Sequence, residues 1–113
     1  MAIVSVKNGK HYSWGGNCDA WHLAESGNLS VIQERVPNGS SEVRHLHNKA
    51  EQFFYILSGI ATLEVGGVVH EIHPYEGLHV PAGNAHTLSN KHNGDLEFLL
   101  ISTPPSHGDR VDT

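Results

Sequence analysis

Short stretches of alternating apolar and polar residues follow one another along this chain, separated by turns rich in glycine, proline and asparagine. A period of two is typical of β-strands, and nowhere is a long 3.6-residue period sustained. We therefore expect an all-β domain of the sandwich or barrel type with little helix. The expected strands cover residues 2–6, 11–14, 18–23, 29–36, 42–47, 53–57, 60–65, 68–72, 78–80, 86–89 and 96–102.

The pair Gly66-Gly67 separates two of these strands. A two-residue hairpin loop of type I′ needs positive φ at both central positions, and glycine adopts that conformation without strain. The sequence therefore predicts a tight hairpin at this point.

Composition narrows the functional classes. With 113 residues the chain forms one domain, and its net charge of −5 with no basic run argues against nucleic acid as a partner. No apolar stretch reaches the roughly 18 residues of a membrane span, and the first residues do not have the pattern of a secretory signal. Cys18 is the single cysteine, so no internal disulfide forms. We expect a cytoplasmic protein with no membrane partner.

Histidine is unusually frequent, with ten residues, and two of them stand at His45 and His47. Residues two apart on a strand point to the same face, so their α-carbons lie roughly 6.6 Å apart. Two imidazoles at that separation can share one ion, and neutral imidazole is a common ligand of divalent first-row metals. The segment 42–47 is therefore a candidate metal-binding strand.

The spacing around these histidines carries a family resemblance. Gly39 precedes His45 by five intervening residues, Gln52 follows His47 after four, and Gly59 follows Gln52 after six. This resembles the first motif of the cupin family, G-x5-H-x-H-x(3,4)-E-x6-G.

A second stretch resembles the second cupin motif, G-x5-P-x-G-x2-H-x3-N. Pro81, Gly83, His86 and Asn90 stand at the family spacing, while Tyr75 replaces the first glycine. The resemblance covers about residues 29–102 and implies the cupin double-stranded β-helix, a jelly-roll barrel, as a single domain over residues 1–113. It also implies that His45, His47 and His86 bind one divalent transition metal ion per chain, with zinc, nickel, iron, manganese and copper all compatible.

The fourth ligand has two candidates, because the family usually supplies glutamate. Gln52 satisfies both flanking spacings and shares strand parity with Phe54 and Ile56, whereas Glu51 satisfies only the shorter spacing from His47. We place Gln52 in the metal shell and keep Glu51 as the alternative, which a bulge in the strand would favour.

Two functions are compatible with such a site. The first is an enzyme acting on a small polar or anionic metabolite, of the isomerase, lyase or dioxygenase type, with Glu51, Tyr55 and His79 as candidates for proton transfer. The second is a non-catalytic cupin that binds or senses a small ligand. Whether the protein is an enzyme stays open at this point, because one fold hosts many chemistries.

Two further expectations concern surfaces. The runs 53–57 and 98–101 are apolar on both faces, so one face needs cover outside the barrel, and we expect a homodimer.

The polar tail 103–113 is either a solvated end or a flap over the barrel mouth in which Arg110 binds an anionic group.

Overall fold

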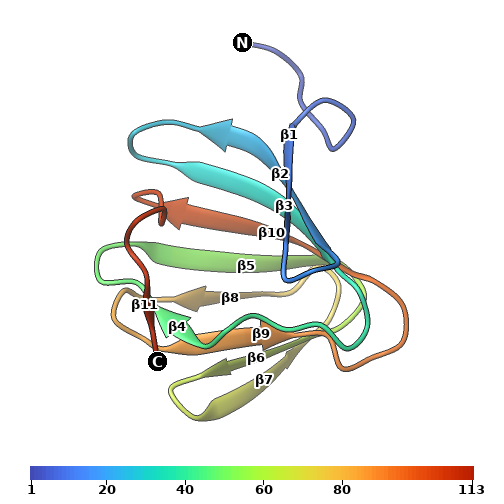
Figure 1. Cartoon of the computed structure of the whole chain (residues 1–113), viewed down its shortest axis with the longest axis vertical. Coiled ribbons are helices and arrows are strands. Elements are labelled where there is room, and N and C mark those ends of the chain that lie inside the picture. Colours follow the sequence, from blue (N-terminus) through green and yellow to red (C-terminus); the bar gives the residue numbers. More distant parts are fainter.

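A computed structural model describes all residues, 1–113, as eleven strands and no helix (Figure 1). No element is a helix long and apolar enough to cross a membrane. The strands are β1 (Lys10–Trp14), β2 (Cys18–Glu25), β3 (Ser30–Val36), β4 (His45–Leu46), β5 (Glu51–Ser58), β6 (Ala61–Val65), β7 (Val68–Ile72), β8 (Gly77–Val80), β9 (His86–Ser89), β10 (Leu96–Thr103) and β11 (Val111–Asp112).

The strands form two sheets. One has the order β1-β2-β3-β10-β5-β8 and the other the order β11-β4-β9-β6-β7, and every pairing is antiparallel. Neighbouring strands are often distant in sequence, so the chain passes repeatedly from one sheet to the other. This arrangement confirms the predicted all-β jelly-roll barrel.

The interior has an apolar part and a polar part. Alternate residues of β3, β5 and β10 are buried, as expected for strands with one face against a core. Phe54 and Phe98 pack with ring centroids 5.9 Å apart in the apolar cluster. The buried polar residues are Ser30, Glu34, His45, His47, Gln52, Thr62, His86, Asn90 and Ser102. Burial of so many polar groups marks the part of the barrel where a site is expected.

At two turns the backbone has positive φ, a conformation that glycine adopts most easily. Gly66 and Gly67 have φ of 57° and 89°, which confirms the predicted hairpin between β6 and β7. Tyr75, which replaces the first glycine of the second cupin motif, adopts φ of 66°. The position therefore still has the left-handed backbone that glycine adopts most easily, and the Tyr75 N–H donates to the carbonyl of Ile56 at 2.7 Å.

Two expected strands differ from the structure. Residues 2–6 are not a strand, because they pair with no neighbour and lead into a turn in which the Asn8 Oδ1 accepts from the Ser5 N–H. The expected strand 42–47 is reduced to β4, preceded by an isolated bridge between Ser41 and Ser89. The ladder is interrupted where the Glu42 side chain turns inward and accepts the N–H of Leu88.

The C-terminal tail is ordered against the barrel, although most of its residues remain exposed. Its strand β11 pairs with β4, and Figure 1 shows it crossing the end of the barrel where β4 lies. The Asp109 carboxylate accepts three backbone N–H groups, which hold its pKa below the ordinary value; the donors are Asn48 (3.0 Å), Lys49 (2.8 Å) and Ala50 (2.9 Å). The tail thus belongs to the wall around the polar interior.

Candidate metal centre

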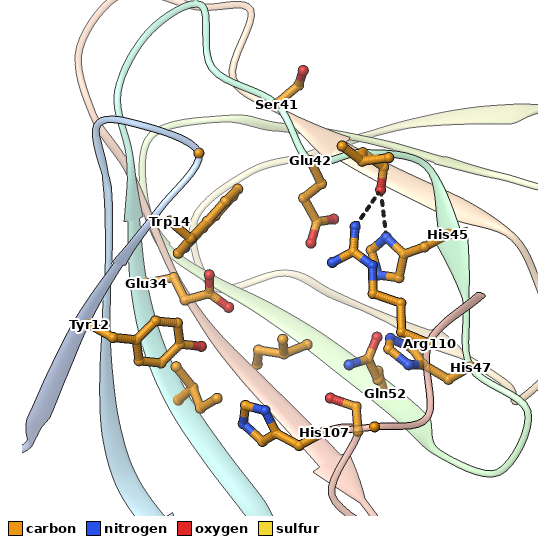
Figure 2. A pocket seen from close by; sticks show the side chains of 16 residues that line it. Tyr12, Trp14, Glu34, Ser41, Glu42, His45, His47, Gln52, His107 and Arg110 are labelled. Carbon is orange, nitrogen blue, oxygen red and sulfur yellow. Dashed lines mark hydrogen bonds between the residues drawn. The ribbon is translucent and has the colours of Figure 1, made fainter. Parts of the chain in front are cut away.

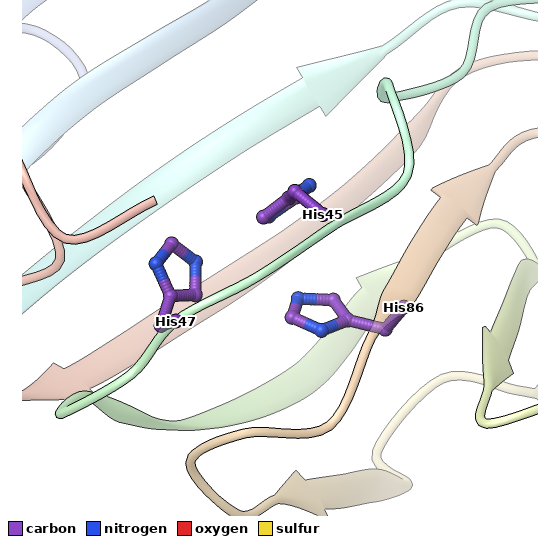
Figure 3. Close-up of side chains that lie close together, drawn as sticks. All are labelled: His45, His47 and His86. Atoms are coloured by element: carbon purple, nitrogen blue, oxygen red, sulfur yellow. The ribbon is translucent and has the colours of Figure 1, made fainter. Parts of the chain in front are cut away.

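Three buried histidines meet inside the barrel, as Figure 3 shows. His45 lies on β4, His47 follows it after one residue, and His86 opens β9, where it pairs directly with His45 across the sheet. One ring nitrogen of each histidine lies within 4.8 Å of the other two. A cation at their centre would therefore be within reach of all three.

Hydrogen bonds fix which nitrogen points to that centre. Each Nδ1 donates to a backbone carbonyl: that of Val43 for His45 (2.6 Å), Asp109 for His47 (2.5 Å) and Asn84 for His86 (2.9 Å). Because a carbonyl only accepts, each neutral ring carries its proton on Nδ1 and presents the lone pair of Nε2. Outer contacts of this kind orient histidine ligands in metal sites.

Burial keeps two of these rings neutral. Desolvation lowers the pKa of His45 to about 4, with the positive charge of Arg110 adding to the shift and the hydrogen bond to Val43 opposing it. Desolvation also lowers the pKa of His86. A metal ligand must be unprotonated, so these shifts favour coordination at neutral pH.

Gln52 points into the same space. Its side chain is 3 % exposed, and its Nε2 donates to the Ser102 Oγ at 3.0 Å. Its Oε1 and the Nε2 of His86 are both buried without a hydrogen-bond partner. Unpaired buried acceptors are costly, and a bound cation would satisfy both. The donor set thus fits a transition metal held by three imidazoles with an amide oxygen nearby.

Glu51 points away from this space. Its side chain is 54 % exposed, and its carboxylate lies 2.8 Å from the Nε2 of His79 on the neighbouring strand β8. Strand β5 pairs regularly with β10 at both candidates, Glu51 opposite Thr103 and Gln52 opposite Ser102, with no bulge between them. The alternation expected from the sequence therefore puts Gln52 inside and Glu51 outside.

A cavity of about 450 Å³ opens beside the histidines and is drawn in Figure 2. His45, His47 and Gln52 line it, but the proton-transfer candidates Glu51, Tyr55 and His79 do not. The volume is that of a site for a small molecule.

Two carboxyls that the sequence reasoning did not single out also line the cavity, the buried Glu34 on β3 and the half-buried Glu42 before β4. Desolvation raises the pKa of Glu34 to about 8, and the charge of Glu42 adds to it. Desolvation also raises the pKa of Glu42 to about 7. Glu34 lies on the same face of its strand as the apolar Ile32 and Val36. An acidic residue on an otherwise apolar strand face is the sequence feature that could have identified Glu34 as a functional candidate.

The tail supplies a cation to the cavity. Arg110 donates from Nε to Asp112 at 2.8 Å and from Nη2 to the carbonyl of Val43 at 3.3 Å, the same oxygen that His45 uses (Figure 2). Its guanidinium lines the cavity with His107. Arg110 thus lies at the wall of the cavity while it is paired with Asp112, and anion binding by Arg110 stays a prediction.

Comparison with protein families agrees with this architecture. The family model described as the Cupin domain matches residues 31–102. The chain belongs to the cupin family. Among curated proteins it is similar to a quercetin 2,3-dioxygenase from Bacillus subtilis (strain 168), with 33 % identity over 61 residues. That match covers 54 % of this chain and 18 % of the relative, so the chain spans only about a fifth of that protein.

Solved structures show the same fold at low identity. An RmlC-like cupin from Shewanella frigidimarina NCIMB 400 superposes with a TM-score of 0.85 and 16 % identity, covering 96 % of this chain and 95 % of that chain. A predicted oxalate decarboxylase from Thermotoga maritima superposes with a TM-score of 0.80 and 23 % identity, covering 93 % and 100 %. These likenesses describe the barrel and leave the chemistry to the site.

Proposed function

We propose that this cupin is a metal-dependent enzyme acting on a small polar or anionic metabolite. The observation that carries the proposal is the convergence of three Nε2 lone pairs, each fixed by a backbone carbonyl, beside a cavity of about 450 Å³. His45, His47 and His86 would hold one divalent transition metal ion, with Gln52 completing the shell. When bound, the ion supplies a Lewis acid that polarises a substrate oxygen.

The remaining residues explain the preference for an anionic substrate. Three imidazoles and an amide are all neutral, so they leave the full charge of the ion uncompensated, unlike a set with the family's usual glutamate. Arg110 adds a second positive charge to the same cavity. A substrate carboxylate or enolate would therefore be attracted to this end of the cavity.

The named relatives and the carboxyls in the cavity suggest which reaction class to test first. The named relatives include a quercetin 2,3-dioxygenase and a predicted oxalate decarboxylase, so dioxygenation and lyase chemistry are represented among similar proteins. The cavity of this chain is lined by a buried carboxyl, Glu34, and a half-buried one, Glu42, that can exchange protons. Isomerase or lyase chemistry uses such groups, and we favour it over dioxygenation.

The test begins with metal content. Untagged protein grown in metal-replete medium is analysed for transition metals, and we expect about one equivalent per chain. Protein loaded with each of zinc, nickel, iron and manganese is then incubated with a panel of small carboxylic acids, oxalate, and quercetin with oxygen. Turnover supports the enzyme, binding without turnover supports the sensor function, and absence of a metal contradicts both.

The adjacent residues Gln52 and Glu51 provide a matched pair of variants. We expect Gln52→Ala to weaken metal affinity by about 10-fold, because it removes a buried amide oxygen that has no hydrogen-bond partner in the protein. Glu51→Ala should leave the affinity almost unchanged, because its carboxylate faces His79 outside the cavity. Competition with a chelator measures both. Loss of metal in Glu51→Ala alone would contradict the placement of Gln52 in the shell.

We propose, in addition, that the protein is a homodimer. Phe53 and Tyr55 on β5 stack with ring centroids 6.2 Å apart, and they pair in register with Ile101 and Leu99 on β10. These side chains lie on the face of the sheet opposite the buried residues, where Phe53 is exposed and the other three are half-buried. A second copy of the same face would remove this apolar surface from water.

Light scattering tests the dimer. We expect twice the 12.3 kDa mass of one chain, and Ile101→Lys should shift the population toward the monomer by placing a charge in the apolar face. Val68→Lys, on the exposed hairpin strand β7, is the matched control and should remain dimeric. A mass of one chain at every concentration would rule out the dimer.

A further inference from the structure

The cavity contains one acid that no protein group binds. Glu34 is 5 % exposed, points into the cavity from β3, and has neither a hydrogen bond nor an ion pair with any side chain (Figure 2). The buried indole Nε1 of Trp14 is the one donor directed at Glu34: its interaction with the carboxyl opposes part of the rise in the pKa of Glu34, although the two groups do not reach good hydrogen-bond geometry. Burying an unpaired carboxyl is unfavourable for folding, so such a group is expected where a ligand uses it.

The surroundings of Glu34 hold it in the neutral form. The titratable groups that interact with Glu34 are Tyr12 on β1, Cys18 on β2 and Glu42 before β4. The other titratable or charged residues that line the cavity are His45, His47, His107 and Arg110. The nearby charge of Glu42 and the loss of water both disfavour a second negative charge at Glu34. The pKa of Tyr12 rises to about 12 by desolvation and by the same two carboxyls. A proton on Glu34 relieves this repulsion.

Glu42 is held differently. Its Oε1 accepts the N–H of Leu88 at 3.0 Å, and both this hydrogen bond and the charge of Arg110 favour its ionised form. Glu34 has no such hydrogen bond, so its carboxyl is free to bind a ligand. Two neighbouring carboxyls with different environments commonly divide acid and base roles between them.

We propose that Glu34 is the acid–base residue of this cavity and exchanges a proton with the substrate bound between it and the histidine cluster. This role rests on the proposed function. In the transfer, the O–H bond of Glu34 breaks, its electron pair stays on the carboxylate, and the proton forms a new bond to a substrate oxygen or carbon. The reverse transfer, from substrate or from water, restores the acid, and no other reactant is consumed.

The experiment follows the Glu34 carboxyl directly. Zinc-loaded protein is labelled with carbon-13 at the glutamate carboxyls and titrated with pH by NMR, and the resonance missing from Glu34→Gln is assigned to Glu34. Glu34→Leu assigns it independently if the first variant folds poorly. We expect this resonance to titrate near 8 instead of near 4.5. Acetate, a small carboxylate used as the probe, should shift it, whereas the resonance missing from Glu51→Gln should not respond.

The possible outcomes distinguish the acid–base role of Glu34 from the proposed metal-dependent function. Protein that binds no zinc contradicts the proposed metal-dependent function. Zinc-loaded protein in which the Glu34 resonance titrates near 4.5, or ignores acetate that calorimetry shows to be bound, overturns the acid–base role alone. With a substrate found in the panel, Glu34→Gln should lower kcat by about 10²- to 10⁴-fold with little change in KM and in zinc content. An unchanged kcat would overturn the role as well.

Discussion

The His86→Ala variant is expected to purify with less than about a tenth of an equivalent of any transition metal, whereas the unaltered chain retains about one. His86 contributes an Nε2 that is buried without a hydrogen-bond partner, and it joins a strand of the second motif to the two histidines of the first. Its removal leaves two imidazoles and one amide, which is too few donors for a tightly bound ion. Elemental analysis of protein from metal-replete medium measures the effect.

A matched histidine outside the site provides the control. His79→Ala removes an imidazole that is 54 % exposed and paired with Glu51, so this variant should keep its metal. Circular dichroism of both variants checks that the barrel is still folded. A full equivalent of metal in His86→Ala would mean that the three histidines do not form the centre.

The second large effect concerns stability and pH. Glu34→Gln is expected to become progressively more stable than the unaltered chain as pH rises from about 4.5 to about 8, by on the order of 4 kcal/mol in total. In this window the unfolded chain has released the proton of Glu34 while the folded chain still holds it. Rising pH therefore favours unfolding of the unaltered chain, and the amide, which does not titrate, removes that penalty.

Urea denaturation of the zinc-saturated proteins at several pH values measures this difference. Metal saturation and the titrating groups distant from residue 34 are common to both proteins, so their contributions cancel in the comparison. The groups that interact with Glu34, Glu42 and Tyr12, are part of the measured difference. Glu51→Gln, whose side chain is exposed, should show no such growing gain. A difference between Glu34→Gln and the unaltered chain that does not change with pH would show that Glu34 titrates alike in the folded and unfolded states.

The local pattern of apolar and polar residues was sufficient to predict much of the barrel. The period of two predicted most of the strands because one side of each strand faces a dry interior and the other faces outward. The same parity predicted that Gln52 points inward and Glu51 outward, since strand β5 is regular at this point. Gly66-Gly67 predicted its hairpin because few other residues adopt positive φ twice in succession. Each of these features depends only on neighbours in the sequence.

Other features depended on contacts between distant segments. Residues 2–6 have the composition of a strand and form none, because they pair with no sheet edge and lead into a local turn in which the Ser5 N–H is bound by Asn8. The tail is polar and rich in turn residues, yet it folds because Asp109 finds three N–H groups about sixty residues earlier in the chain. Its carbonyl also fixes the ring of His47. Such partners are invisible to a local pattern.

The sequence by itself determined the fold class and the meeting of His45, His47 and His86, because the resemblance to the two cupin motifs implies one shared site for them, and the structure places His45 and His86 on paired neighbouring strands. Only the tertiary structure decided which nitrogen each ring presents, and that Glu34 and Glu42 share one cavity with Arg110. The physical reason is that burial and charge act through space. A carboxyl keeps its proton because of the groups that surround it in the folded chain, and those come from β1, β3, the segment before β4 and the tail together.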